Sequence, residues 1–188
     1  MHDIFISYSR RDSDIVMRFI EGFQREGFTV WYDKDGIETG DTFKKVIVKA
    51  IEQARIVVFF SSQASNASEW TAKEIGIANA RKKHIIPVKL DHSLYNPDVE
   101  FDIINLNFVD YTQLQDSALP ELCDSIRNKL AAMRAQEQAA RRDIEKEMRF
   151  KVSLNMLQSQ IDKLQEEKSG IVRQMKEIGM EVSEEHPA

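Results

Sequence analysis

The sequence predicts an α/β fold: a five-stranded parallel sheet of the flavodoxin-like, doubly wound kind, followed by a long C-terminal helix or coiled coil. Two observations support this prediction. Up to about residue 133, short apolar β-rich runs alternate with stretches whose apolar residues recur every three or four positions, as in parallel sheets. After residue 133, glycine and aromatic residues become rare, and the sequence is charged and strongly helix-forming.

The first strand is expected at residues 3–9, DIFISYS, and a polar loop follows it. Asp12 or Ser13 is then placed to cap a helix that ends at Gly27. The inward face of that helix carries Val16, Phe19, Ile20 and Phe23. Residues 28–33, FTVWYD, form the second predicted strand.

A polar loop with two glycines, residues 34–42, leads into the second helix. Its inward residues are expected to be Phe43, Val46, Ile47, Ala50 and Ile51. The third strand, residues 55–62 (RIVVFFSS), is the most apolar run, so we expect it at the centre of the sheet, covered on both faces. Asn66 or Ser68 is placed to cap the next helix.

Residues 84–90, HIIPVKL, form the fourth predicted strand. Pro87 within it favours an edge strand or a strand end, because proline has no N–H for the sheet ladder. After an irregular stretch, residues 107–112 form a short fifth strand, and a helix begins at about Ser117. In this architecture ligands bind beyond the carboxyl ends of the strands. Polar residues gather at those ends, in residues 7–11, 33–36 and 61–62.

The C-terminal third is predicted to consist of a charged helical linker, residues 134–149, and a coiled coil, residues 150–183. Two interleaved apolar rows indicate the coiled coil. They are Phe150, Leu157, Leu164, Ile171 and Ile178, and Leu154, Ile161, Lys168, Met175 and Val182. The lysine in the second row, Gly170 and Gly179 weaken the pattern. A helical hairpin turning at Ser169-Gly170 and a helix packed on the domain are the alternatives.

The bulk composition excludes several classes of protein. The net charge of -5 provides no overall basic field for nucleic acid or an anionic membrane, and no apolar run is long enough to span a bilayer. The single cysteine, Cys123, permits no internal disulfide and is expected to be a small buried residue. The N-terminal run lacks the features of an export signal, so we expect a soluble, cytoplasmic protein, with a secreted effector as the alternative.

Several familiar kinds of site are missing from the sequence. No GxGxxG or Walker-type loop follows a strand, and the four histidines are scattered, so neither a standard nucleotide cradle nor a metal site is expected. No acidic cluster of a receiver domain follows Asp3, and Ser61 and Ser62 lack a hydrolase nucleophile motif. What remains is SEWTAKEIG, which places Trp70 and Glu74 one turn apart at the start of a helix.

Three stretches together resemble a known family. DIFISYSRRD, FTVWYD with its glycine-containing loop, and SEWTAKEIGIA resemble, in order and spacing, the successive boxes of a TIR (Toll/interleukin-1 receptor) domain over about the first 133 residues. The resemblance implies that Glu74 is the catalytic glutamate of an NAD+-cleaving member, with Trp70 beside it. It also implies that Tyr8 and Arg10 contact the substrate, with Arg10 or Arg11 at the diphosphate.

The resemblance also assigns residues 33–43 to the BB loop of the family, which forms protomer contacts and gates the pocket. Asp33 and Phe43 are its expected substrate-binding residues, and Gly36 and Gly40 its contact and gating residues. One departure is Thr71, which stands where the family frequently has a cysteine beside the tryptophan.

A single carboxylate is chemically sufficient for the implied reaction. Cleavage of the nicotinamide–ribose bond creates an oxocarbenium-like centre, but the cationic nicotinamide leaves as a neutral molecule and needs no acid. Glu74 would therefore stabilise the positive charge and bind the ribose hydroxyls, while Trp70 offers an aromatic face. NAD+ is here a substrate, no cofactor is expected, and the products are nicotinamide with ADP-ribose or a cyclic isomer.

Simpler readings stand beside this one. Composition alone favours Glu74 as a solvated helix residue with Trp70 in the core. For Tyr8 a buried core ring is the alternative that is slightly favoured over a ligand contact, and for Arg10 and Arg11 surface solvation stands equal to diphosphate binding. The main alternative function is a non-enzymatic TIR adaptor that acts by self-association; a third is an effector or defence protein that recognises its partner through the coiled coil. The expected partners are NAD+, a second copy joined through both the TIR domain and the coiled coil, and other TIR domains.

Overall fold

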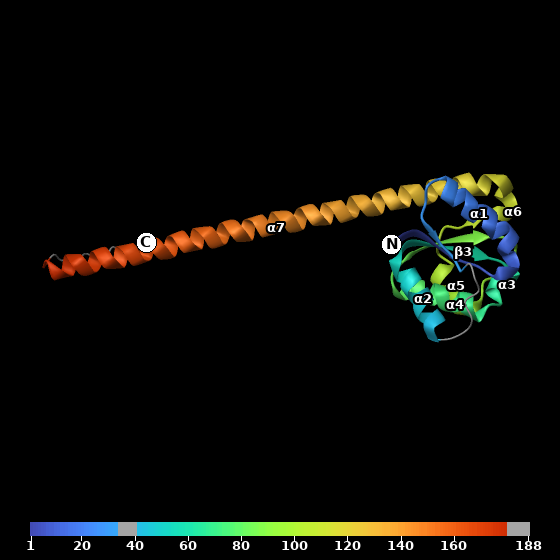
Figure 1. Cartoon of the computed structure of the whole chain (residues 1–188), viewed down its shortest axis with the longest axis horizontal. Helices are drawn as coiled ribbons and strands as arrows, with labels where there is room; N and C mark the ends of the chain where they lie inside the picture. Colours follow the sequence, from blue (N-terminus) through green and yellow to red (C-terminus); the bar gives the residue numbers. More distant parts are fainter. Residues whose placement is uncertain (34–40, 180–188) are drawn as a thin grey trace. The chain divides into compact units, whose positions relative to one another are not determined.

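The structure is a computed structural model that describes residues 1–33 and 41–179 (Figure 1). The chain divides into two compact units, Met1–Met133 and Arg134–Ala188. The predicted division of the second unit into a linker and a coiled coil stays a prediction.

The first unit alternates strands with helices. Its strands are β1 (His2–Ser7), β2 (Val30–Trp31), β3 (Ala54–Ser61), β4 (His84–Lys89) and β5 (Val109–Asp110). Its helices are α1 (Ser13–Arg25), α2 (Asp41–Gln53), α3 (Gln63–Asn66), α4 (Glu69–Ala80), α5 (Pro97–Ile103) and α6 (Tyr111–Leu114), with 3-10 turns η1 (Arg10–Asp12) and η2 (Gln115–Ser117). The last helix, α7 (Ala118–Glu177), begins in the first unit and continues into the second.

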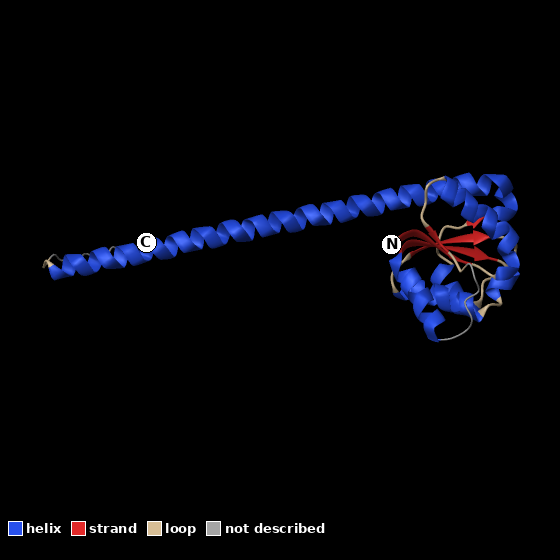
Figure 2. Ribbon diagram, in the orientation of Figure 1, coloured by secondary structure: helices blue, strands red, loops and turns tan. Residues whose placement is uncertain are grey.

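The five strands form one parallel sheet in the order β2-β1-β3-β4-β5, with helices on both faces (Figure 2). This is the flavodoxin-like order, so the predicted fold class is confirmed. Strand β3 lies at the centre, as its apolar sequence predicted, and six consecutive residues of it are buried.

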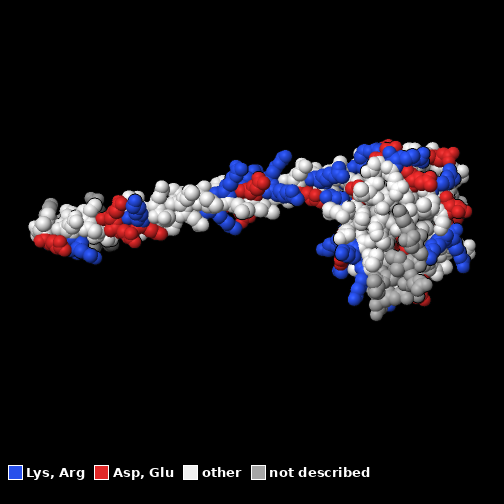
Figure 3. All heavy atoms as spheres, viewed as in Figure 1, with Lys and Arg blue, Asp and Glu red and all other residues white. Residues whose placement is uncertain are grey.

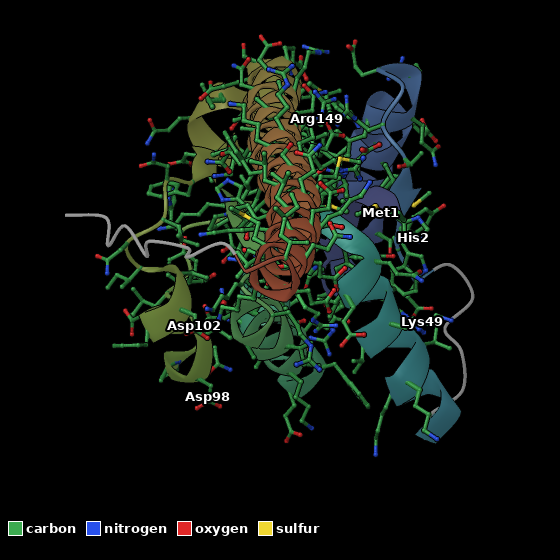
Figure 4. The ribbon with its side chains drawn as sticks, turned by 90° about the vertical axis from the view of Figure 1, so that its left-hand side faces the viewer. Met1, His2, Lys49, Asp98, Asp102 and Arg149 are labelled. Atoms are coloured by element: carbon green, nitrogen blue, oxygen red, sulfur yellow. The ribbon has the colours of Figure 1, made fainter. Side chains whose placement is uncertain are left out.

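Successive residues of a strand face opposite sides of the sheet, and each side has its own core. One core combines Ile4, Ile6, Val58 and Phe60 with α1 and the first turns of α7, including Phe19, Phe23, Leu122 and Ile126. The other combines Phe5, Val57 and Phe59 with α2, α4 and α5, including Ile47, Ile75 and Ile103. Helix α4 lies between α2, which carries Lys49, and α5, which carries Asp98 and Asp102 (Figure 4).

The edges of the sheet differ from the sequence prediction. Strands β2 and β5 each have two residues, fewer than the runs predicted for them. Strand β4 is not an edge strand, because β3 and β5 flank it, and Pro87 is in its interior. Proline is tolerated there because β5 pairs only with Val88 and Lys89, so no β5 residue stands opposite Pro87.

Local signals predicted several helix ends and most of the inward-facing residues. Ser68 caps α4 by accepting from the Thr71 N–H, and Gly27 follows α1 with a φ of 85°. Asp12 stands at the N-cap position of α1 but makes no capping hydrogen bond. Val46, expected to face inward, is 36% exposed, because Ile47, Ala50 and Ile51 fill the sheet-facing side of α2. The stretch predicted to be irregular contains α5.

In the second unit, α7 continues without interruption to Glu177. The predicted alternative of a hairpin at Ser169-Gly170 is therefore wrong: the helix passes through both residues. Large apolar side chains in this unit are exposed, and Val182 lies outside the described residues. Figure 3 shows a stretch of the unit without acidic or basic side chains between two charged clusters, which matches residues 152–161. Among the described helices, none is long and apolar enough to cross a membrane.

Candidate functional site

Glu74 lies at the carboxyl end of the sheet. Ser7 is the last residue of β1 and shares the face of Phe5, which is the face that α4 covers. From α4, one Glu74 carboxylate oxygen, Oε2, accepts a hydrogen bond of 2.7 Å from the Ser7 hydroxyl. The Ser7 side chain is fully buried. The strand end therefore fixes one oxygen of the carboxylate.

Burial changes the acidity of Glu74. Its pKa is raised from 4.5 to about 7, because removal from water penalises the charged form and the negative charge of Asp33 adds to that penalty. The hydrogen bond from Ser7 acts in the opposite direction and lowers the pKa. Such a shift is typical of acids and bases at functional sites.

Asp33, just after β2, is the second carboxylate of this region. Its Oδ2 atom accepts a hydrogen bond of 2.5 Å from Arg10 Nη2, and the Arg10 side chain is 63% exposed. Its Oδ1 atom is buried and has no hydrogen-bond partner among the described residues. A buried acceptor without a donor lowers the stability of the protein when no ligand is bound. A hydroxyl of a bound molecule would supply the missing hydrogen bond.

Tyr8 lies close to the same charges, but its ring faces the other side of the sheet. The ring packs against the core on the α1 side. Burial raises the pKa of its hydroxyl, with a further contribution from Asp33 that Arg10 partly offsets. Tyr8 is therefore near Asp33 and Arg10 but packs on the face opposite Glu74.

Trp70, one turn before Glu74, is 38% exposed and so is not a core residue. The Lys73 ammonium lies 5.2 Å from the centre of its ring. The two helices α2 and α4 enclose a mostly apolar groove of about 580 Å³ beside Trp70 and Glu74. Its walls include Lys44, Ile47, Val48 and Ile77. A flat aromatic group would find apolar walls there and an aromatic face at one end.

A network of serine hydroxyls holds the neighbouring strand ends, and sequence reasoning missed it. Ser62, after β3, caps α3 and donates to Asp12 Oδ2 at 2.6 Å. Asn66 donates to both Ser61 and Ser93. These buried polar groups are paired, so the network rigidifies the carboxyl edge of the sheet. The run of serines at residues 61–68 is the only signal in the sequence that pointed to it.

Three predicted site residues fall wholly or partly outside what the structure describes. Gly36 and Gly40 lie outside the described residues, and so does the side chain of Phe43. Within residues 1–33 and 41–179, no group of three or more His, Cys, Asp and Glu side chains is placed to hold a metal ion. Cys123 is buried, and its burial raises the pKa of the thiol to about 11.

Curated proteins with a related sequence are named as cyclic ADP-D-ribose synthases or NAD(+) hydrolases. "Probable 2' cyclic ADP-D-ribose synthase TcpO" of Methanobrevibacter olleyae is 35% identical over 74 residues, which cover 39% of this chain and 22% of that protein. "2' cyclic ADP-D-ribose synthase BtTIR" of Bacteroides thetaiotaomicron is 27% identical over 101 residues, covering 52% of this chain and 35% of that protein. The chain thus matches between about a fifth and a third of the length of these relatives.

The fold has solved counterparts. The TIR domain of the Toll-related receptor TRR-2 from Hydra magnipapillata superposes with a TM-score of 0.58 at 18% identity, covering 68% of this chain and 99% of that one. The model of the family described as "TIR domain" matches residues 4–123. That match takes in most of β1, the strands β2 to β5 and the Glu74 helix, and it spans more than half of the sequence. The chain belongs to the TIR domain family.

Proposed function

We propose that this chain is an NAD+ glycohydrolase, which breaks the nicotinamide–ribose bond and yields nicotinamide with ADP-ribose or a cyclic isomer. The single observation that supports this most is the Glu74 carboxylate, which points to the carboxyl end of β1 and accepts from Ser7. The relatives TcpO and BtTIR, named 2' cyclic ADP-D-ribose synthases, support the class of reaction.

Glu74 acts as a carboxylate in this proposal. The C1'–N bond breaks heterolytically, its electron pair leaves with neutral nicotinamide, and positive charge develops on the ribose. A carboxylate fixed on one side by Ser7 stabilises that charge through its other oxygen. Water or a hydroxyl of the same molecule then adds to C1' and loses a proton, giving ADP-ribose or the cyclic isomer.

The half-buried position of Glu74 gives selectivity for a cationic substrate. With a pKa of about 7, roughly half of the free protein carries the charged form at neutral pH. A bound pyridinium favours that charged form, because opposite charges in a poorly solvated site attract strongly. Binding of the substrate therefore completes the ionisation that the reaction needs.

The other predicted residues take binding roles. Trp70 stacks on the departing base beside the α2–α4 groove. Asp33 Oδ1, which has no partner among the described residues, accepts from a ribose hydroxyl. Arg10, whose side chain is mostly exposed, meets the diphosphate, and Tyr8 lines the same strand end. Phe43 belongs to the proposed binding set, and Gly36 and Gly40 to the proposed contact and gating loop.

Self-association and location are part of the proposal. Residues 1–133 act as the TIR domain, residues 134–149 as a charged linker and residues 150–183 as a coiled coil that brings TIR domains together. The protein acts in the cytoplasm on NAD+, pairs with copies of itself and associates with other TIR domains by the same surfaces.

Nicotinamide release tests the proposal. We expect the purified chain to release nicotinamide from NAD+ and Glu74→Gln to lose at least about a thousandfold in rate, because the variant keeps the shape but not the charge. Glu69→Gln is the matched control, since the Glu69 side chain lies on the same helix and is 88% exposed. Chromatography of the second product distinguishes ADP-ribose from a cyclic isomer.

Two results would contradict the enzyme. One is folded, concentrated protein that releases no nicotinamide; the other is Glu74→Gln that turns over as fast as Glu69→Gln. Either leaves a TIR domain that acts by association alone.

A further inference from the structure

The second unit carries an apolar seam, defined as Phe150, Leu154, Leu157, Ile161, Leu164, Ile171, Met175 and Ile178. Ile161 is 47% exposed and Phe150 is 76% exposed, and the other seam residues lie between these values, except for the partly buried Met175. The repeat averages 3.5 residues per turn, which keeps the seam on one side only if the helix supercoils with another helix. The seam therefore fits a long helix with the same repeat.

We propose that two copies of this chain pair through the seam as a parallel, in-register coiled coil, with both TIR domains attached to the same end. A second copy offers the same repeat over the same length, so every apolar layer finds an apolar partner. This inference rests on the proposed function in one respect, because it states how two of the proposed sites are brought together.

Lys168 fixes the register. It occupies an a position of the heptad, within the seam, and Glu167 occupies the flanking g position. In a parallel pair, an a side chain packs into a hole bordered by the g residue of the other helix, so each Lys168 reaches the partner's Glu167. In register, both lysines share one layer. A slip by one heptad would spread them over two layers and bury each against apolar residues.

The same two residues disfavour an antiparallel pair. In the antiparallel register that overlaps the whole seam, Lys168 faces the partner's Leu164, because a positions then meet d positions. Glu167 stands opposite the partner's Glu167, because g positions meet g positions, and these two carboxylates repel. Charge complementarity thus exists in the parallel arrangement and is lost in the antiparallel one.

The parallel arrangement has a consequence for the TIR domains. Two domains joined to the same end of a coiled coil face each other at an effective concentration of about a millimolar. An antiparallel arrangement would hold them at opposite ends of the coil instead. Parallel pairing therefore converts contact between TIR domains into an event within one dimer.

Cysteine cross-linking tests the orientation in the full chain. In a Cys123→Ala background, Leu157→Cys and Met175→Cys each place one thiol in the seam, at positions that would face each other in the antiparallel register. Ser159→Cys, on the outer face of the helix, is the matched control. The single-cysteine chains are mixed in pairs and oxidised by air, and the disulfides are identified by mass.

The proposal expects disulfides between identical positions, 157 with 157 and 175 with 175, at least about tenfold faster than for Ser159→Cys. Disulfides that join 157 to 175 would overturn it, and so would equal rates for all three variants or a monomer by light scattering. None of these readouts needs substrate, so the absence of NAD+ cleavage would leave the result unaffected.

A charge exchange provides the second test. Lys168→Glu puts like charges beside each other and is expected to raise the dimer dissociation constant by at least about tenfold. Adding Glu167→Lys restores opposite charges across a parallel pair, so the double variant should recover the original constant. If the double variant dissociates as readily as Lys168→Glu, the parallel contact is wrong, because in an antiparallel pair the exchange would merely replace two facing carboxylates by two facing ammonium groups.

Discussion

The two units of the chain differ in how far their large apolar side chains are buried. In the first unit, Phe59 and Ile75 are fully buried and polar groups gather at the strand ends. In the second, Phe150 and Leu164 are more than half exposed although they are as apolar as the core residues. The first unit thus forms its own core, whereas the second presents exposed apolar side chains of the kind that mark an interaction surface. The proposed chemistry belongs to the first unit and its control to the second.

Among the tests of this comparison between the two units, disrupting the seam should have the largest effect. Leu157→Asp with Leu164→Asp in the full chain places charges in two core layers and should prevent pairing. At about 1 µM protein we expect NAD+ cleavage per molecule to fall at least about tenfold, because the millimolar effective concentration is lost. Assays over a dilution series measure this, and higher protein concentration should restore the rate. Ser159→Asp, on the outer face of the helix, is the control. An equal loss of NAD+ cleavage in this variant and in the seam variant would contradict the proposed role of the seam.

The second prediction concerns the cost of the buried charge at Glu74. Its pKa is higher in the folded protein than the ordinary 4.5, so the folded state holds the proton more tightly. The ionised form is therefore penalised above pH 7, the penalty fades as the pH falls from 7 to 4.5, and it is absent below that range. A rise to about 7 corresponds to a penalty of about 3 kcal/mol at most.

Glu74→Gln removes that penalty. We expect the variant to be more stable than the original protein at pH 8 and to lose this advantage by pH 4.5. Chemical unfolding at both pH values, followed by circular dichroism, measures the difference. Glu69→Gln should show no such pH dependence. A Glu74→Gln variant that is less stable at pH 8 would mean that the carboxylate contributes to folding instead of opposing it.

Ser7→Ala should have a smaller effect on the proposed reaction. The Ser7 hydroxyl lowers the pKa of Glu74, so its loss should raise that pKa further and move the acidic limb of the kcat/KM profile to higher pH. We expect about a tenfold loss at pH 7 and a smaller loss at pH 9. Ser61→Ala removes a buried hydroxyl at the end of β3 without touching Glu74 and is the control. Identical pH profiles for both variants would argue against the positioning role of Ser7.

The smallest predicted effect is on the second unit alone. Gly170 is inside α7 with open space around it, so Gly170→Ala should stabilise the helix by roughly 0.5–1 kcal/mol. Gly179, with a φ of 76°, is the contrasting position, since alanine is strained there. Thermal unfolding of the helical signal should rise for Gly170→Ala only. A gain at both positions would contradict the positive φ of Gly179.

Much of the fold was predictable because local patterns and tertiary structure agree. The alternation of β-rich runs with amphipathic stretches gave five strands, and the apolar run after Ala54 marked the central one. The lengths of the edge strands were overestimated, because β-propensity marks a longer run of residues than the few that pair with a neighbouring strand. The place of Pro87 was predicted wrongly for a related reason. A strand inside the sheet accommodates proline where its neighbour is too short to pair with that residue, and the length of β5 decides this for Pro87.

The candidate site was predictable in its residues but not in its contacts. The SEWTAKEIG stretch identified Glu74, yet nothing in the sequence indicated that Ser7, from a strand far away in the chain, would hold one of its oxygens. The sequence also did not show that Tyr8 packs on the face of the sheet opposite Glu74, because the register of β1 decides that. The raised pKa of Glu74 likewise arises from burial and from Asp33, which only the fold brings together.

The two edge strands have a consequence for the proposed pairing of two chains. Because β2 and β5 are each two residues long, each offers only a short row of amide and carbonyl groups on which a strand from another molecule could dock. In the proposed dimer, edge strands this short disfavour growth into fibrils by strand addition.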